Sequence, residues 1–116
     1  METTIKSMTR IENRSTPRFK GKSGSHIFYL EGFGAIRDLS LKGMYVVDPE
    51  PLPDGTKIKF AFRSGSLDVP MEGVVTRSEP GKGMVILFTD LSREAIRRLK
   101  IHITELGPPL GEPKER

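Results

Sequence analysis

Two arginines four positions apart, Arg14 and Arg18, have the chemistry to bind an anion together. Pro17 lies between them, and it disfavours helical backbone at Thr16 and removes one backbone donor. We therefore expect a bent, non-helical segment on which both guanidinium groups can converge on one ligand. A guanidinium makes bidentate hydrogen bonds to phosphate and stacks on purine faces, which an ammonium does less well. The alternative interpretation is a solvated run of charge, because such pairs are common by chance.

A second polar segment, Asp38-x-Ser40-x-x-Gly43, follows Arg18 after twenty positions. In extended backbone, side chains two positions apart share a face, so the oxygens of Asp38 and Ser40 would lie side by side. A carboxylate accepts from the N–H groups of a guanine edge, and a hydroxyl donates to a phosphate or a purine. Gly43 would let a flat base approach the backbone. Taken alone, the segment favours a β-turn in which Asp and Ser bond to the backbone and Gly takes a positive φ.

The remaining residues with catalytic or metal-binding chemistry are few. The chain has no cysteine, which excludes disulfides, thiolate metal sites and a thiol nucleophile. His26 and His102 are too isolated for a His-rich metal site, and no Ser-His-Asp set is spaced persuasively. A carboxylate metal site stays open on composition, but Asp48, Glu50 and Asp54 cluster around prolines, where turn formation explains them. We predict no catalytic residue, no metal site, no cofactor and no enzyme activity.

The scaffold that positions these residues is predicted between residues 24 and 89. Short extended runs alternate there with turn residues at intervals of roughly 8 to 12, typical of an all-β sandwich or barrel. We predict six strands, near residues 25–30, 33–39, 43–47, 57–63, 67–77 and 84–88. Ile58, Phe60 and Phe62 alternate with more polar positions, as in a half-buried strand. Pro70 removes a ladder donor, which favours an edge position or a bulge.

A helix is predicted after the last strand, with Asp90 or Ser92 as its N-cap. Four apolar residues follow at helical spacing and should close one barrel mouth: Ile96, Leu99, Ile103 and Leu106. Gly107-Pro108-Pro109 ends this helix, and residues 110–116 are too polar and too rich in Pro and Gly to bury a surface. We therefore divide the chain into a basic arm (1–22), a barrel with its closing helix (23–106) and a disordered tail (107–116).

Charge is distributed unevenly along the chain. Of the 116 residues, 35% are hydrophobic and 29% charged, as in ordinary one-domain proteins. The net charge is +4, and residues 1–22 hold six basic and two acidic residues, whereas acidic and basic residues balance elsewhere. A duplex-binding surface needs Lys and Arg spread over the fold, so the short basic arm suits a compact anion better. The chain shows no spanning run and no secretory signal, which predicts a cytoplasmic protein without membrane contact.

Together, the two motifs resemble those of the PilZ family, the cyclic di-GMP receptor domains defined by Arg-x-x-x-Arg followed by Asp/Asn-x-Ser-x-x-Gly. The resemblance continues through Gly73–Arg77, Gly83–Phe88 and Asp90–Ser92, and covers approximately residues 12–105. It implies a mainly β fold, a six-stranded antiparallel β-barrel with a C-terminal α-helix. It also implies that the ligand is held outside the barrel, between the N-terminal arm and the region of the second and third strands.

Carried over to this chain, the resemblance implies a site of five residues. Arg14 and Arg18 would bind phosphate and stack on or bond to guanine, Asp38 and Ser40 would contact the base, and Gly43 would admit it. Many relatives have Arg where this chain has Asn13. Whether one ligand or an intercalated pair binds therefore stays open. Asn13 and Lys20 are possible additional contacts.

The implied function is a stand-alone receptor in bacterial second-messenger signalling. We expect cyclic di-GMP to order the arm against the barrel and the signal to pass to a protein effector. One alternative is a PilZ-fold interaction module without nucleotide binding. Another is a small basic barrel that binds single-stranded nucleic acid, which needs exposed aromatic residues. The candidates for such stacking are more often core residues: Phe19, Phe28, Tyr29, Phe33 and Tyr45.

Overall fold

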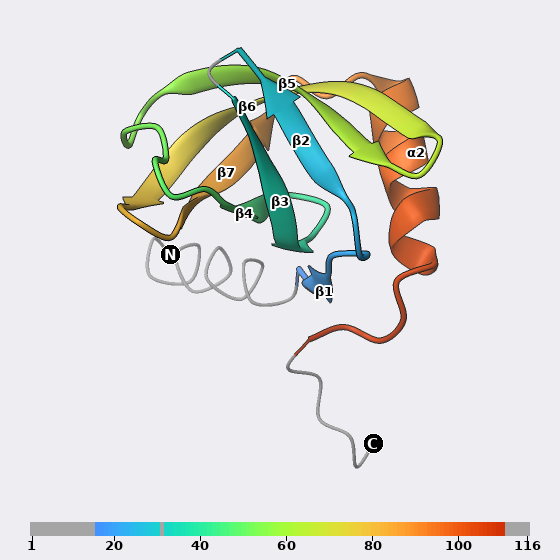
Figure 1. Cartoon of the computed structure of the whole chain (residues 1–116). Helices are drawn as coiled ribbons and strands as arrows, with labels where there is room; N and C mark the ends of the chain where they lie inside the picture. Colours follow the sequence, from blue (N-terminus) through green and yellow to red (C-terminus); the bar gives the residue numbers. More distant parts are fainter. Residues whose placement is uncertain (1–15, 31, 111–116) are drawn as a thin grey trace, which may run out of the picture.

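Seven strands and one helix make up residues 16–30 and 32–110, which the computed structural model describes (Figure 1). The six longer strands match the six predicted runs, and the mainly β class is confirmed. The elements are β1 (Phe19–Lys20), β2 (His26–Tyr29), β3 (Gly32–Leu39), β4 (Gly43–Val47), β5 (Lys57–Ser64), β6 (Leu67–Glu79), β7 (Gly83–Thr89) and α2 (Arg93–Thr104).

The six longer strands form a closed antiparallel barrel. Its order is β3-β2-β5-β6-β7-β4, and β4 pairs back with β3, which confirms the predicted architecture. The short strand β1 was not predicted, because two residues carry no periodicity. On the edge of β3 where β2 ends, β1 continues the pairing, with Phe19 opposite Leu39 and Lys20 opposite Asp38. The end of the basic arm is thus held to the barrel by backbone pairing.

Pro70 occupies a part of β6 that has only one neighbouring strand. It lies opposite Ala61 of β5, whereas β7 pairs with β6 only from Glu72 onward. The missing N–H of the proline therefore leaves no gap in a two-sided ladder, and the predicted edge position is confirmed. The bulge of β6 lies further along, between Val75 and Arg77.

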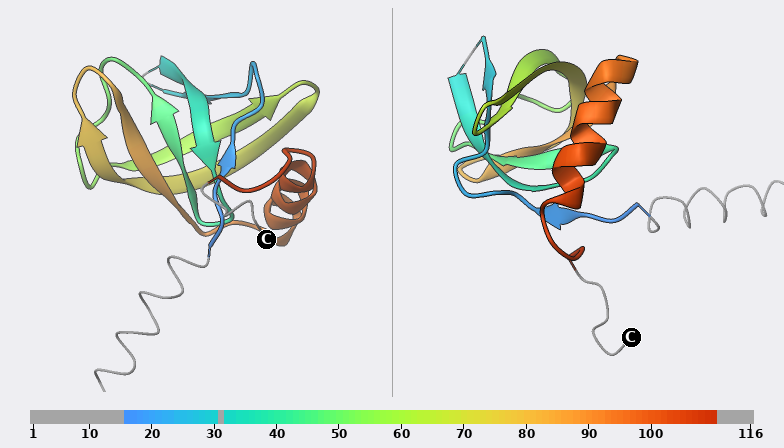
Figure 2. Two further views of the ribbon diagram at one scale, coloured as in Figure 1. Left: turned by 90° about the horizontal axis from the view of Figure 1, so that it is seen from below. Right: turned by 90° about the vertical axis from the view of Figure 1, so that its right-hand side faces the viewer.

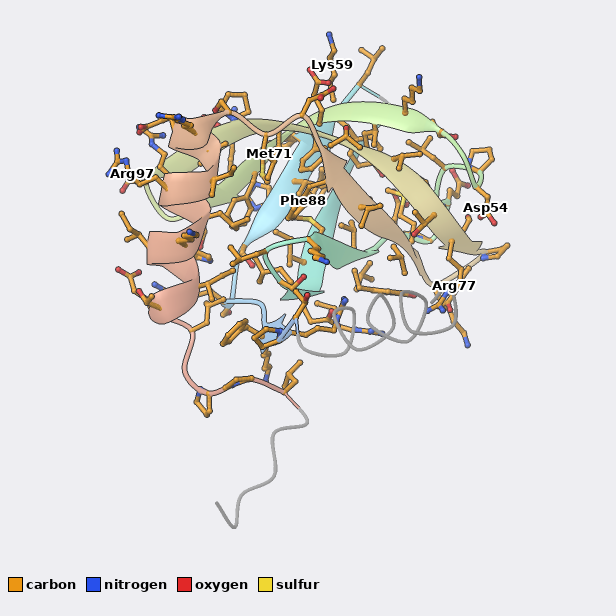
Figure 3. The ribbon with its side chains drawn as sticks, turned by 180° about the vertical axis from the view of Figure 1, so that it is seen from behind. Asp54, Lys59, Met71, Arg77, Phe88 and Arg97 are labelled. Atoms are coloured by element: carbon orange, nitrogen blue, oxygen red, sulfur yellow. The ribbon has the colours of Figure 1, made fainter. Side chains whose placement is uncertain are left out.

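The barrel interior is filled by the inward residues of every long strand. Ile58, Phe60 and Phe62 are buried, as their alternation predicts. They join buried side chains of the other five long strands in one core, and Figure 3 draws the side chains on the ribbon. The helix α2 lies along one side of the barrel (Figure 2). It adds three residues to the core from outside: Ala95, Leu99 and Ile103.

Ser92 is the N-cap of α2, as predicted, and its hydroxyl oxygen accepts from the Ala95 N–H at 3.0 Å. The predicted inner face was wrong at Ile96, which is exposed. The buried stripe runs through Ala95, Leu99, His102 and Ile103, so Leu99 and Ile103 are buried as predicted, and the stripe is shifted toward a histidine that hydropathy does not mark as buried.

The last described residues return to the arm. The Leu110 N–H donates to the Arg18 carbonyl at 2.7 Å, and residues 111–116 of the predicted tail lie outside the described residues. No helix in the described ranges is long and apolar enough to cross a membrane. The same ranges hold no group of three or more His, Asp or Glu residues that could bind a metal ion.

Candidate functional site

Asp38 is the centre of the candidate site. Its side chain is 6% exposed and accepts hydrogen bonds from two arginines, one on each oxygen. Arg18 donates from Nε to Oδ1 at 2.8 Å and also from Nη2 to the same oxygen, while Arg37 donates from Nε to Oδ2 at 2.8 Å. The structure thus joins the arm motif to the second motif, which lies twenty residues further along the chain.

Backbone pairing positions Arg18 over this carboxylate. Lys20 lies opposite Asp38 in the β1–β3 ladder, and the Gly21 N–H donates to the Arg37 carbonyl at 2.9 Å. A Cβ at Gly21 would overlap the Ile36 carbonyl oxygen, so only glycine allows the chain to cross β3 this closely. The arm therefore reaches the site along a defined path, with exposed Lys20 beside it.

Arg37 is a functional candidate that the sequence analysis missed. Strand alternation places it on the face opposite Asp38, but the β3–β4 register shifts between Ile36 and Asp38, so a bulge lies at Arg37. Its guanidinium carbon lies 3.8 Å from the centroid of the Tyr45 ring. The Arg37 side chain is 58% exposed, so its guanidinium rests on the ring and stays accessible from solvent.

The Tyr45 ring supports the Arg37 guanidinium on the side that faces the barrel. The ring is buried, and its hydroxyl donates to Glu79 Oε1 at 2.6 Å. That hydrogen bond, followed by burial, raises the pKa of Tyr45, and the same bond lowers the pKa of the Glu79 carboxyl. Arg77 lies at the end of the barrel away from α2 (Figure 3), and its Nε is 3.3 Å from Glu79 Oε2. Charges of alternating sign therefore run from Arg18 across β3 and β4 to Arg77.

Ser40 and Gly43 shape the turn that follows Asp38. The Ser40 hydroxyl oxygen accepts from the N–H groups of Lys42 (3.0 Å) and Gly43 (3.3 Å), and the Ser40 N–H donates to the Gly43 carbonyl at 2.8 Å. The predicted side-chain closure by serine is confirmed. The predicted positive φ at Gly43 is wrong, because Gly43 begins β4 opposite Leu87, where a Cβ would overlap the Ile86 carbonyl oxygen.

Two predicted residues, Asn13 and Arg14, lie outside the described residues. The five aromatic candidates for base stacking divide among three environments. Phe28 is 40% and Phe33 62% exposed, contrary to the expectation of core positions, and Tyr45 is buried. The other two, Phe19 and Tyr29, are half-buried. Alternation in His26–Tyr29 leaves the choice of inner face open, because both of its faces carry apolar or aromatic side chains.

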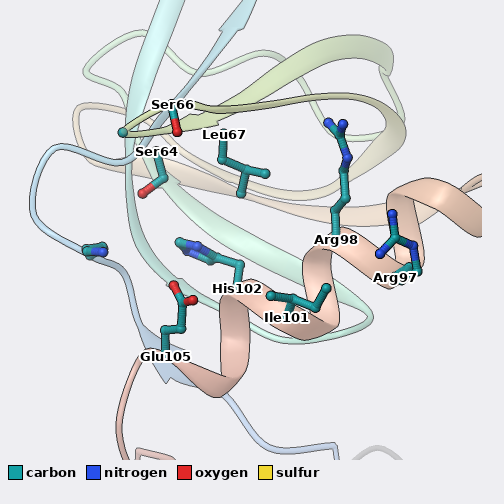
Figure 4. A pocket seen from close by; sticks show the side chains of 10 residues that line it. Ser64, Ser66, Leu67, Arg97, Arg98, Ile101, His102 and Glu105 are labelled. Atoms are coloured by element: carbon teal, nitrogen blue, oxygen red, sulfur yellow. The ribbon is translucent and has the colours of Figure 1, made fainter.

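A separate cleft of about 630 Å³ lies between α2 and the β5–β6 hairpin, and none of the predicted site residues lines it (Figure 4). Buried His102 faces this cleft with Ser64 and Lys22. In the part of the chain that the structure describes, its Nε2 has no hydrogen-bond partner. Burial lowers the pKa of His102, which Glu105 partly offsets and Lys22 reinforces.

Comparisons with known proteins agree with this geometry. The model of one family, the PilZ domain, matches residues 10–105. The crystal structure of a Legionella uncharacterized protein, Lpg0364, is similar in fold, with a TM-score of 0.57 and 19% identity over 77% of this chain and 91% of that chain. A search of curated proteins finds no match.

Proposed function

The chain belongs to the PilZ domain family, whose members are in general receptors for cyclic di-GMP, and on that premise we propose that this protein binds cyclic di-GMP at Asp38. The observation that carries the proposal is the docking of Arg18 on Asp38, because it brings both family motifs into one place. The proposed ligand-binding residues are Arg14, Arg18, Asp38, Ser40 and Gly43, with Asn13 and Lys20 as additional contacts.

Ligand binding exchanges one set of donors on Asp38 for another. The carboxylate is nearly buried beneath Arg18, so a guanine edge reaches it only when Arg18 moves aside. The N1–H and N2–H₂ groups of guanine then replace the guanidinium donors, and Arg18 is freed to bind a phosphate. Arg14, from the same arm, would bind the phosphate or guanine beside it. The ligand thereby bridges the arm to the barrel and orders it.

We assign a stacking role to Arg37 in the same site. Tyr45 supports one face of its guanidinium, and the exposed side chain offers the other face to a purine. The Glu79 bond fixes the Tyr45 hydroxyl, so the stack is held in place before the ligand arrives. Arg37 thus supplies a third guanidinium, in a chain that has Asn13 where many relatives have arginine.

Ser40 and Gly43 support the base-binding carboxylate. Their turn is closed by three hydrogen bonds immediately after Asp38, which limits the positions that the carboxylate can take. Among the described residues, the Ser40 hydroxyl donates one long hydrogen bond, to the Gly43 carbonyl at 3.4 Å, which a ligand acceptor can replace once the site opens. According to this proposal, the protein is a receptor that signals to a protein effector and is not an enzyme.

Calorimetric titration with cyclic di-GMP tests the proposal. We expect saturable binding at tens of micromolar ligand or below, about −6 kcal/mol or stronger. Arg14→Ala, Arg18→Ala and Asp38→Ala should each weaken binding by at least about tenfold, since each loses a charge-assisted contact. Arg93→Ala, which removes an exposed arginine at the start of α2, is the matched control and should bind as the native protein does.

Two results would contradict the proposal in different ways. Absence of heat with the native protein would favour an interaction module without nucleotide binding. Tight binding to oligo-dT with a steep salt dependence would favour the nucleic-acid alternative, because phosphate contacts release counterions. Adding GTP in place of cyclic di-GMP tests whether recognition needs the cyclic dinucleotide.

A further inference from the structure

Six apolar side chains and one histidine form one continuous surface on the outside of the barrel. Pairing places Phe33 opposite Phe28, Phe28 opposite Ala61, and Ala61 opposite Pro70, in a row across four strands. The neighbouring row runs from Val47 through Ala35 to His26. We call this surface the aromatic patch, and its members are Val47, Ala35, His26, Phe33, Phe28, Ala61 and Pro70.

The aromatic rings of the patch pack against one another in solvent. The Phe28 and Phe33 centroids are 5.7 Å apart, and His26 meets Phe28 edge-on at 4.9 Å. Phe33 is 62% and Phe28 40% exposed. The solvent face of an antiparallel sheet is normally polar, and contiguous exposed apolar surface marks an interaction site. The patch is therefore a candidate docking surface.

Charge at the patch favours a protein over a phosphate-bearing partner. His26 is followed in its row by Arg63 and then Asp68, which form an ion pair at 3.2 Å. The Arg63 guanidinium carbon also lies 4.6 Å from the Phe28 ring centroid. The cation within these two rows is thus already paired, whereas nucleic acid and anionic lipid need unpaired cations. An uncharged, apolar partner fits the patch better.

The size of the patch favours a short segment over a second copy of the chain. Four strands at about 4.8 Å spacing and two rows about 7 Å apart give a footprint on the order of a few hundred Å². A stable protein interface buries about 800 Å² on each partner. We propose that the aromatic patch docks a short apolar segment of a partner protein; the assignment of that protein as the effector rests on the proposed function.

The patch adjoins the proposed ligand site along one strand. Phe33, Ala35 and Arg37 are exposed at alternate positions of β3, and successive members are about 7 Å apart. A segment seated on the patch would therefore lie beside the Arg37 guanidinium that rests on Tyr45. Ligand and partner can bias each other through direct contact at Ala35 and Arg37, without any change in the barrel.

Peptide selection on the full chain tests the patch without cyclic di-GMP. Random twelve-residue peptides are displayed on phage and selected on the native protein, with the Phe33→Ser protein as soluble competitor. We expect enriched peptides to be apolar and uncharged at their centre and to bind at least tenfold more weakly to Phe33→Ser and Phe28→Ser. Ile101→Ser is the matched control, because it removes a 50% exposed apolar side chain from α2.

A second measurement does not depend on the variants. NMR spectra of the native protein with a selected peptide should show the largest shift changes at the Phe28 and Phe33 rings. Equal binding to Phe33→Ser, or shift changes centred elsewhere, overturns the proposal. So does a stable dimer that Phe33→Ser dissociates, or binding to oligo-dT or to phosphatidylserine vesicles that this variant abolishes.

Failure of the patch and failure of the ligand site give different results. Phe33→Ser should bind cyclic di-GMP with native affinity, whereas Arg18→Ala should not. If the native protein binds no cyclic di-GMP but binds the selected peptides at Phe33, the proposed function fails and the docking surface stands. If it binds cyclic di-GMP and no peptide, the docking surface alone is rejected.

Discussion

Gly43→Ala tests whether the last glycine of the second motif serves packing. A Cβ at this position would overlap the Ile86 carbonyl oxygen and lie 3.3 Å from the Leu87 Cα, both of them backbone atoms that no rotamer change can move. We expect β4 and β7 to be forced apart by roughly 1 Å, at a cost of about 2–3 kcal/mol of unfolding free energy, as for overpacked cores. For a domain of this size, Tm should fall by roughly 10–20 °C.

Thermal and urea denaturation followed by far-ultraviolet circular dichroism measure this loss. Gly24→Ala is the control for the added methyl group, since Gly24 has a positive φ and open space around it. That variant should lose only about 1 kcal/mol, from backbone strain. If Gly43→Ala keeps its Tm within about 2 °C of the native value and loses only ligand affinity, the packing explanation is wrong, and Gly43 serves to admit the base.

Three further predictions concern charged and polar pairs. A double-mutant cycle with Arg18→Ala and Asp38→Ala should give a coupling of about 1 kcal/mol in urea unfolding, because Arg18 is 43% exposed and solvent screens the pair; a coupling near zero would contradict the observed bond. Tyr45→Phe should raise the pKa of the Glu79 carboxyl toward its ordinary value, as measured by NMR titration, since the Tyr45 bond lowers it. The folded-state pKa of His102 is below its ordinary value, so its contribution to stability is present above about pH 6.5 and is lost as pH falls, by at most about 1.4 kcal/mol per pH unit. His102→Leu should flatten this dependence in urea unfolding at pH 7.5, 6.0 and 5.0, and an unchanged slope would assign it to other groups.

The barrel was predictable from the sequence because its strands alternate clearly and its turns are marked by Gly and Pro. Ile58, Phe60 and Phe62 indicate one inner face, and Ser92 marks the start of the helix. The short strand β1 was not predictable, because Phe19 and Lys20 are recognisable as a strand only by their pairing with β3. The rotation of α2 that exposes Ile96 depends equally on tertiary packing, which buries His102 instead.

The sequence identified which residues belong to the candidate site better than it identified the contacts that they make. Two motifs identify Arg18 and Asp38, and the structure brings them together. Arg37 escaped detection because alternation places it on the face opposite Asp38, and its contacts with Asp38 and Tyr45 arise at a bulge that has no sequence signature here. Phe28 and Phe33 were expected in the core, since a strand with apolar residues on both faces does not reveal which face is inside.

The backbone bond between Leu110 and Arg18 makes the described chain almost a ring. A covalent path of more than ninety residues closes on itself through one N–H and one carbonyl, beside the side chain that covers Asp38. Arg18 and Leu110 therefore lie at the same corner of the molecule. On the proposed function, a ligand that displaces the Arg18 side chain would therefore act directly beside the bond that joins the two ends of this loop.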